Sequence, residues 1–198
     1  MKHLLLASNN ADKATEFRDL FRDMAITFTT LHDHPPFPPT VEDAPTLEGN
    51  AVKKAMEAFA KTGIPSVGDD TGLEVHYLDG RPGVYSSRFA GPGATYADNC
   101  KKLLDDMRGV APRRRGAQFR CVLAFVPDSR TVHCVEGVCR GVITERPAGK
   151  GGFGYDPIFL PDGYTQTFGE MTLATKNTLS HRALAIMALK DHLRSIGW

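Results

Sequence analysis

The stretch SVGDDTGLEV, residues 66–75, sets two aspartates, Asp69 and Asp70, between an apolar run and a glycine. The apolar residues and the alternation in GLEVHYL, residues 72–78, predict two consecutive strands with a buried face. Because a charged pair is costly to remove from water, these carboxylates predict a functional role. The alternative is a surface turn with two solvated aspartates, which the flanking apolar runs disfavour.

Neighbouring side chains on a regular strand point to opposite faces of the sheet. Asp69 and Asp70 therefore reach one ion only if the chain bends, and Gly72 offers a place for such a bend. Mg²⁺ prefers one or two carboxylates together with substrate phosphates, and Glu42 is a third candidate carboxylate. A carboxylate at this position is also a candidate general base. A glycosidase pair is disfavoured, since its two carboxyl groups flank a bond about 5–9 Å apart.

Working outward, strand-like and helix-like segments alternate on both sides of this stretch. The expected strands are HLLLAS (3–8), AITFTT (25–30), AQFRCVLAFV (117–126) and TVHCVEGVCRGVI (131–143), the last two forming an antiparallel hairpin. The expected helices cover 11–24, 46–63, 94–109 and 179–197. A proline-rich segment (32–45) and a glycine-rich segment (79–93) are expected loops. This order predicts an α/β fold with a mixed sheet.

Composition narrows the class of protein. At 198 residues with 41% hydrophobic residues, the chain predicts one domain, residues 1–198, with a substantial core. A net charge of +1 argues against nucleic-acid and membrane partners, and no apolar run approaches the ~20 residues of a membrane span. The N-terminal apolar segment is too short for a signal peptide, so a cytoplasmic location and four free cysteines are expected.

Two segments are suited to bind anions. In ASNNADK, residues 7–13, Asn10 is a candidate N-cap and Lys13 lies in the first helical turn, where free N–H groups attract phosphate. Taken alone, this segment is better explained by an ordinary cap and a solvated lysine. In LSHRA, His181 and Arg182 follow a candidate cap, Ser180. Basic residues there oppose the helix dipole, which suggests an anionic ligand, although a histidine bonded to a carbonyl is an equal alternative.

The segment GKGGFGYDPIF, residues 149–159, joins flexible glycines to Phe153 and Tyr155. Backbone N–H groups can approach a ligand here, and an aromatic ring can stack on a base. The spacing matches neither a Walker loop nor a dinucleotide-binding fingerprint. A glycine-rich turn before a strand is the alternative.

In their joint order and spacing, these motifs resemble the inosine triphosphate pyrophosphatase family, close to its bacterial members. The resemblance covers nearly the whole chain and rests on LASNNADKATEF, NAVKKA, GDDTGLEV, PGVYSSRFAG, FRCVLAF, GVITERPAGKGGFGYDPIF and LSHRALA. It implies Mg²⁺-dependent hydrolysis of non-canonical purine nucleoside triphosphates (ITP, dITP and XTP) to the monophosphate and pyrophosphate. It further implies an elongated mixed sheet flanked by helices, two lobes around a substrate cleft, and a homodimer.

The resemblance also assigns roles to single residues. Asp70 matches the proton acceptor and a metal ligand, with Glu42 and Asp69 as the other candidate ligands. The remaining residues match substrate contacts: Ser8, Asn9, Asn10, Ala11, Asp12, Lys13, Lys54, Thr71, Phe153, Gly154, Tyr155, Asp156, Lys176, His181 and Arg182. The chain departs from the family at Thr71, where serine is usual, at Thr46-Leu47, where a TF pair is common, and in the prolines of the loop that holds Glu42.

Three alternatives stay open. The same phosphate chemistry would serve a pyrophosphatase for modified pyrimidine nucleotides. A nucleotide-binding module without turnover is disfavoured, because a pure binder needs no base beside Lys13. A nucleic-acid-binding protein is suggested only by APRRRGAQFRC, residues 111–121, and the chain lacks a wider basic excess.

Overall fold

A computed structural model describes residues 2–36 and 38–198. Its contacts divide the chain into two compact units. Unit 1 comprises the described residues up to Asp70 together with Cys121–Gly137 and His181–Trp198, and unit 2 comprises Thr71–Arg120 and Val138–Ser180. Each unit is built from several separate stretches of chain, so neither corresponds to one half of the sequence.

The strands form a mixed six-stranded sheet in the order β2-β1-β3-β4-β5-β6. β1 pairs in parallel with both β2 and β3, and β5 pairs antiparallel with β6. The strands are β1 (Lys2–Leu6), β2 (Ile26–Thr30), β3 (Ser66–Val75), β4 (Gly116–Val126), β5 (His133–Ile143) and β6 (Phe159–Pro161). The predicted α/β class with a mixed sheet is confirmed.

The helices are α1 (Ala11–Leu20), α2 (Leu47–Thr62), α3 (Tyr96–Asp106), α4 (Leu173–Lys176) and α5 (His181–Ser195). Their ends follow local sequence signals. Asn10 caps α1 by accepting the Lys13 N–H at 3.0 Å, as predicted. Thr46 caps α2, and Gly63 ends it in the left-handed conformation at φ 67°.

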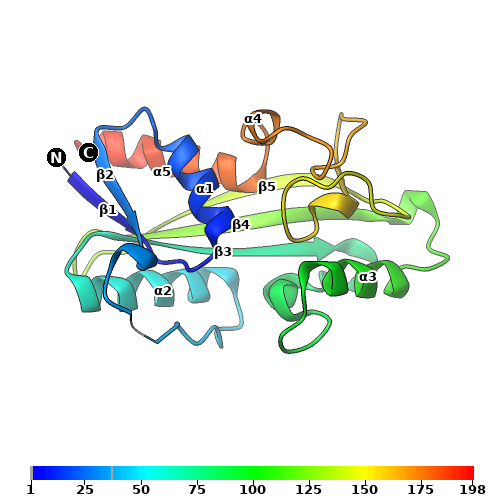
Figure 1. Ribbon diagram of the computed structural model, residues 1–198, viewed down its shortest axis with the longest axis horizontal. Helices are drawn as coiled ribbons and strands as arrows, with labels where there is room; N and C mark the ends of the chain where they lie inside the picture. The colour runs from blue at the N-terminus through cyan, green and yellow to red at the C-terminus, as the bar shows by residue number, and fades with distance from the viewer. Residues whose placement is uncertain (1, 37) are drawn as a thin grey trace. The chain divides into compact units, whose positions relative to one another are not determined.

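In unit 1, alternate residues of β1 serve opposite faces of the sheet. Leu4 and Leu6 pack in one apolar cluster with Phe17 of α1 and Ile186 of α5. Leu5, between them, packs in another cluster with Ala58 of α2. Figure 1 shows the same layering, with α1 and α5 on one face of these strands and α2 on the other. A carboxylate on β3 therefore faces either α1 and α5 or α2, depending on its position.

Unit 2 has its own core, in which α3 and the adjoining segments of strand pack together. Leu73, Leu103, Phe119, Phe159 and Phe168 are among its fully or largely buried members. Thr95 and Asp98 form a capping box at the start of α3. The hairpin prediction agrees with the structure, since β4 and β5 are neighbours joined by residues 127–132.

Two expectations are corrected, and two short elements were not predicted. One strand, β3, runs through Ser66–Val75 where two were expected. Residues 76–78 form a short 3-10 helix instead of continuing the strand. The short β6 and α4 were not predicted, because elements of three and four residues carry no periodic signal.

The four cysteines are free, as expected. In the part of the chain that the structure describes, no helix has the length and apolar character needed to cross a membrane. Phe37, in the predicted proline-rich loop, lies outside the described residues.

Candidate active site

Asp70 lies in a cluster of polar side chains on the α2 side of β3. Lys54 Nζ donates to Asp70 Oδ1 at 2.7 Å and lies 2.7 Å from Glu42 Oε1. Asn50 Nδ2 donates to the other Asp70 oxygen at 3.3 Å. Asp70 is 6% exposed and Lys54 8%, so this ion pair is screened from bulk water.

The sequence of α2 explains how these side chains meet. Asn50 and Lys54 are four residues apart and share one face of the helix. That face lies close to β3, because residue 68 is a glycine. A Cβ at Gly68 would lie 2.0 Å from the Ala51 carbonyl oxygen, so only glycine permits this approach.

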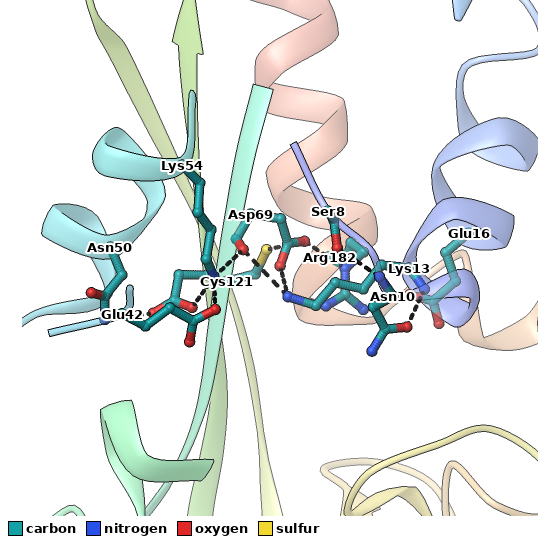
Figure 2. Close-up of polar contacts among 11 residues, drawn as sticks. Ser8, Asn10, Lys13, Glu16, Glu42, Asn50, Lys54, Asp69, Cys121 and Arg182 are labelled. Atoms are coloured by element: carbon teal, nitrogen blue, oxygen red, sulfur yellow. Dashed lines mark hydrogen bonds and ion pairs between the residues drawn. The ribbon is translucent and has the colours of Figure 1, made fainter. Parts of the chain in front are cut away.

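Asp69 serves a second cluster, formed with α1 and α5. Its Oδ1 accepts a hydrogen bond from Lys13 Nζ, and its Oδ2 accepts one from Arg182 Nε at 2.7 Å. Arg182 also donates from a terminal nitrogen to Glu16 Oε2 at 2.6 Å. Since Lys13 and Glu16 lie one turn apart on α1, two cations and two anions connect three elements (Figure 2).

The two aspartates differ in their electrostatics. Burial disfavours ionisation of Asp69, but the charges of Arg182 and Lys13 outweigh it and hold the Asp69 pKa well below its usual range. Burial raises the pKa of Asp70 above its usual value, and Lys54 opposes this only in part. Asp69 is thus fixed as a carboxylate, whereas Asp70 is the better proton acceptor.

Both clusters meet at the backbone of Asp69. Its carbonyl oxygen accepts from Lys54 Nζ at 3.1 Å and from Lys13 Nζ at 3.3 Å. Figure 2 shows the two lysines approaching Asp69 from opposite sides. Burial disfavours the Lys54 charge, but Asp70 and Glu42 outweigh it and raise the Lys54 pKa. Each ammonium group is also paired with a carboxylate, Lys13 with Asp69 and Lys54 with Asp70, so the two lysines place N–H donors for a phosphate directly beside the carboxylates.

Glu42 and Asp70 fit a divalent cation, because their carboxylate oxygens converge on one positive charge, Lys54 Nζ. No group of three or more histidine, cysteine, aspartate or glutamate side chains suited to a metal occurs among the described residues. A pair is sufficient for Mg²⁺ when substrate phosphates supply the other ligands. Asp69 bonds two cations of its own, Lys13 and Arg182, whereas Asp70 and Glu42 share one cation, Lys54, so the metal role of Asp69 stays a prediction.

The other predicted contacts of unit 1 lie at the start of α1. Ser8 Oγ accepts the Asn10 N–H at 3.1 Å, which orders the turn between β1 and α1. The remaining predicted residues here, exposed at or just before the first helical turn, are Asn9, Ala11 and Asp12. Their backbone N–H groups belong to a helix N-terminus, the end that attracts phosphate.

α5 begins at His181, directly after Ser180 as expected. Arg182 is 1% exposed and its charge is met by Asp69 and Glu16. These two carboxylates explain why a basic residue lies in the first turn of α5. From the sequence, an anionic ligand was expected there. His181 is 3% exposed, and substrate contact by either residue stays a prediction.

Unit 2 holds the predicted base-binding residues. Lys176 Nζ donates to Asp156 Oδ2 at 2.6 Å and lies 4.7 Å from the centre of the Phe153 ring. Asp156 also accepts the Phe153 N–H at 2.8 Å, and Gly154 between them has φ 60°. The Tyr155 hydroxyl donates to the Ser86 carbonyl at 2.9 Å. Thr71, the predicted substrate contact that follows Asp70 on β3, is half-buried.

Two members of these clusters were not predicted from the sequence. Asn50 is the first residue of the motif NAVKKA, and its spacing of four from Lys54 places both side chains on one helical face. Glu16 lies between the buried Ala14 and Phe17 of α1, and an acidic residue at a buried helical position is itself a signal of a cationic partner.

Comparison with known proteins gives the family. A model of the Ham1 family matches residues 4–192. The chain belongs to the Ham1 family. It is 41% identical over 198 residues to a dITP/XTP pyrophosphatase of Geobacter sulfurreducens, covering 100% of this chain and 98% of the relative. It is 43% identical over 193 residues to one of Desulforamulus reducens, covering 98% and 96%.

Solved structures agree. A HAM1 protein from Coxiella burnetii matches with a TM-score of 0.88 and 36% identity, covering 98% of this chain and 100% of that one. The Ham1 protein of Staphylococcus aureus matches with a TM-score of 0.87 and 32% identity, covering 98% and 99%. The family membership predicted from the motifs is confirmed.

Proposed function

We propose that this chain hydrolyses non-canonical purine nucleoside triphosphates, of the dITP and XTP class, to the monophosphate and pyrophosphate. The observation that carries the proposal is the Asp70 cluster, in which a proton acceptor with a raised pKa lies beside the buried ammonium group of Lys54 and near the half-buried one of Lys13. Relatives of nearly equal length are named dITP/XTP pyrophosphatases, which supports the same activity here.

Asp70 is the proposed general base. Its Oδ1 is held by Lys54 and its Oδ2 by Asn50, so the carboxylate has a fixed orientation. In the proposed reaction it takes a proton from the water that attacks the α-phosphorus, and the bond to the bridging oxygen of pyrophosphate breaks. General-base catalysis of this kind contributes about 10²–10⁴-fold to the rate.

Lys13, Lys54 and the N-terminus of α1 would stabilise the negative charge that develops on the leaving pyrophosphate. Fixed positive groups act strongly in a site screened from water, and losing one such group typically costs about 10²–10³ in rate. Asp69 is bonded to Lys13, and Arg182 holds Asp69 in turn, so this cluster orients one of the two ammonium groups.

Glu42 and Asp70 would hold Mg²⁺, with substrate phosphates supplying further oxygen ligands. The ion would neutralise phosphate charge and help to orient the triphosphate. The predicted homodimer and cytoplasmic location rest on the family resemblance and the composition, and sedimentation analysis would test the first.

Specificity for this class would depend on the 6-position of the purine. Hypoxanthine and xanthine carry a carbonyl acceptor there, whereas adenine carries an amino donor. A protein N–H that bonds this acceptor is left unpaired by adenine, and such mismatches discriminate by roughly 10⁴-fold. The predicted readers are a backbone N–H or the His181–Arg182 pair. Two Arg182 nitrogens already bond Asp69 and Glu16, which favours the backbone or His181.

The test is pyrophosphate release from ITP and XTP, with and without Mg²⁺, beside ATP, GTP and a panel of modified pyrimidine triphosphates. We expect Mg²⁺-dependent turnover of ITP and XTP, reduced about 10²-fold or more in Asp70→Asn. Turnover confined to pyrimidines would move the proposal to another substrate class. No turnover of any nucleotide, with binding retained, would leave a binding module, and full activity of Asp70→Asn would place the base elsewhere.

A further inference from the structure

Asn50 is a fully buried amide at the junction of three segments: the loop that carries Glu42, helix α2 and strand β3. Three of the four hydrogen-bonding positions of its side chain are used. Oδ1 accepts the Ala44 N–H at 3.0 Å, while Nδ2 donates to the Ala44 carbonyl at 3.4 Å and to Asp70 Oδ2 at 3.3 Å. No assignment of function from the sequence included this residue.

The orientation of the amide is fixed by its partners. The Asp70 carboxylate accepts hydrogen bonds and the Ala44 N–H only donates them. A flipped amide would set two oxygens against each other and two donors against each other. Asn50 therefore holds Ala44 and Asp70 in one defined relation, which a side chain with only acceptors or only donors does not achieve.

By bonding both Ala44 and Asp70, Asn50 links the two carboxylates that contact Lys54, namely Glu42 and Asp70. Glu42 lies two residues before Ala44 and is only partly buried, on a loop, residues 38–46, without helix or strand structure. We infer that Asn50 is a positioning residue, which fixes the Asp70 carboxylate relative to the Glu42 loop so that both carboxylates face one cation. The inference rests on the proposed function, since it assigns Asn50 a part in the reaction through Asp70.

The chain offers a matched control in Asn99 of α3. Asn99 is also buried, accepts the Ala90 N–H at 2.8 Å and donates to the Ser87 carbonyl at 3.1 Å. It thus ties a loop to a helix by the same pair of backbone bonds, while none of its recorded partners is a carboxylate. Asn50→Asp and Asn99→Asp each keep the acceptor and lose the donor, and only Asn50→Asp removes a bond to Asp70. Because Asn50→Asp also sets a negative charge beside Asp70, Asn50→Ala, which adds no charge, must show the same loss of kcat, and wild-type kcat in Asn50→Ala would overturn the inference.

The experiment compares wild type, Asn50→Asp, Asn50→Ala and Asn99→Asp. Measured are kcat and KM for ITP, the Mg²⁺ concentration for half-maximal rate, the melting temperature and hydrogen exchange of the Ala44 amide. In Asn50→Asp we expect kcat and kcat/KM to fall together by about tenfold or more, since ~1 Å of misplacement can cost about 10²-fold. The Ala44 amide should stay protected in Asn50→Asp and exchange faster in Asn50→Ala, which should also need more Mg²⁺.

Wild-type kcat in Asn50→Asp, with a loss of melting temperature equal to that of Asn99→Asp, would overturn the inference and leave Asn50 a structural residue. Absence of pyrophosphate release from wild type and Asn99→Asp alike would mean that the proposed function has failed. In that case Mn²⁺ binding to the protein without nucleotide, monitored by electron paramagnetic resonance, tests the role of Asn50. Weaker Mn²⁺ binding in Asn50→Ala than in Asn99→Asp supports the positioning role, and equal binding overturns it.

Discussion

At the scale of single residues, Asp69 and Asp70 show how adjacent carboxylates acquire different roles. A regular strand sends them to opposite faces, so Asp69 meets Arg182 and Lys13, whereas Asp70 meets Lys54 and Asn50. One is compensated by two cations and has a lowered pKa, while the other has a raised one. The desolvation cost of Asp69 is thus offset by two cations on one face of the sheet, and that of Asp70 by one cation and an amide on the other.

The first prediction separates the two roles through Asp69→Asn and Asp70→Asn. Removing one partner of a buried ion pair costs about 3–5 kcal/mol, so Asp69→Asn should lose stability of that order at pH 7, because Arg182 keeps only Glu16. Asp70→Asn should lose activity with a much smaller loss of stability, since Lys54 keeps Glu42. Urea unfolding monitored by circular dichroism gives both free energies.

The pH dependence checks the cause. A carboxyl group with a lowered folded pKa binds fewer protons folded than unfolded, so its contribution is present above the unfolded pKa, about 3.9, and is lost as the pH falls. The stability difference between wild type and Asp69→Asn should therefore shrink below about pH 4. A difference that stays constant between pH 7 and pH 3 would show that lost packing, and not lost charge, explains the effect.

At the scale of elements, periodicity and end signals predicted the helices of ten or more residues and the longer strands. α1 and α2 begin next to Asn10 and Thr46, which bond the first turn, and these are local features. The expectation of two strands around Gly72 was wrong, because a glycine permits a break in a strand without requiring one, and Gly72 lies inside the single strand β3. The partners of Asp69 depend on which helix covers which face, and that is a non-local property.

The second prediction concerns the contact between α2 and β3. In Gly68→Ala the new methyl group would meet the Ala51 carbonyl oxygen at 2.0 Å and the Ala55 nitrogen at 2.9 Å, and both are backbone atoms. Overpacking of this kind costs about 1–3 kcal/mol and should move α2, which carries Asn50 and Lys54, away from Asp70. We expect a lower melting temperature and a lower kcat, measured by calorimetry and pyrophosphate release.

Gly141→Ala is the matched control for this variant. Its methyl group would meet the backbone of β6, the Leu160 oxygen at 2.3 Å and the Pro161 Cα at 2.9 Å, in unit 2. Both variants should be destabilised, but only Gly68→Ala displaces the helix that carries Lys54. If both variants lose kcat in proportion to their stability, the close approach of α2 has no separate part in the reaction.

At the scale of the whole molecule, three strands pass from one compact unit to the other. Residues of β3, β4 and β5 belong to unit 1 at one end and to unit 2 at the other. If one unit unfolds, its part of β3, β4 and β5 is lost, and the same three strands continue into the other unit. Unfolding of one unit should therefore destabilise the other. The sequence predicted one domain over residues 1–198, and unfolding behaviour is the property that tests this prediction.

The third prediction uses the cysteines as reporters, because each unit contains two. Cys121 and Cys134 belong to unit 1, while Cys100 and Cys139 belong to unit 2. Burial raises the pKa of Cys100 and of Cys139 to about 11, so at pH 8 about one thiol in 10³ is ionised. Cys134 is half-buried and should react first in the folded protein.

Pulses of iodoacetamide at pH 8 across a urea series, read by mass spectrometry of peptides, follow each thiol separately. We expect Cys121, Cys100 and Cys139 to become reactive at the same urea concentration, because the shared strands make unfolding of the two units cooperative. Reactivity of Cys100 and Cys139 at lower urea than Cys121 would show that unit 2 opens by itself. The single-domain prediction would then be wrong, and the Asp70 cluster would belong to a unit that holds its structure while the predicted base-binding residues unfold.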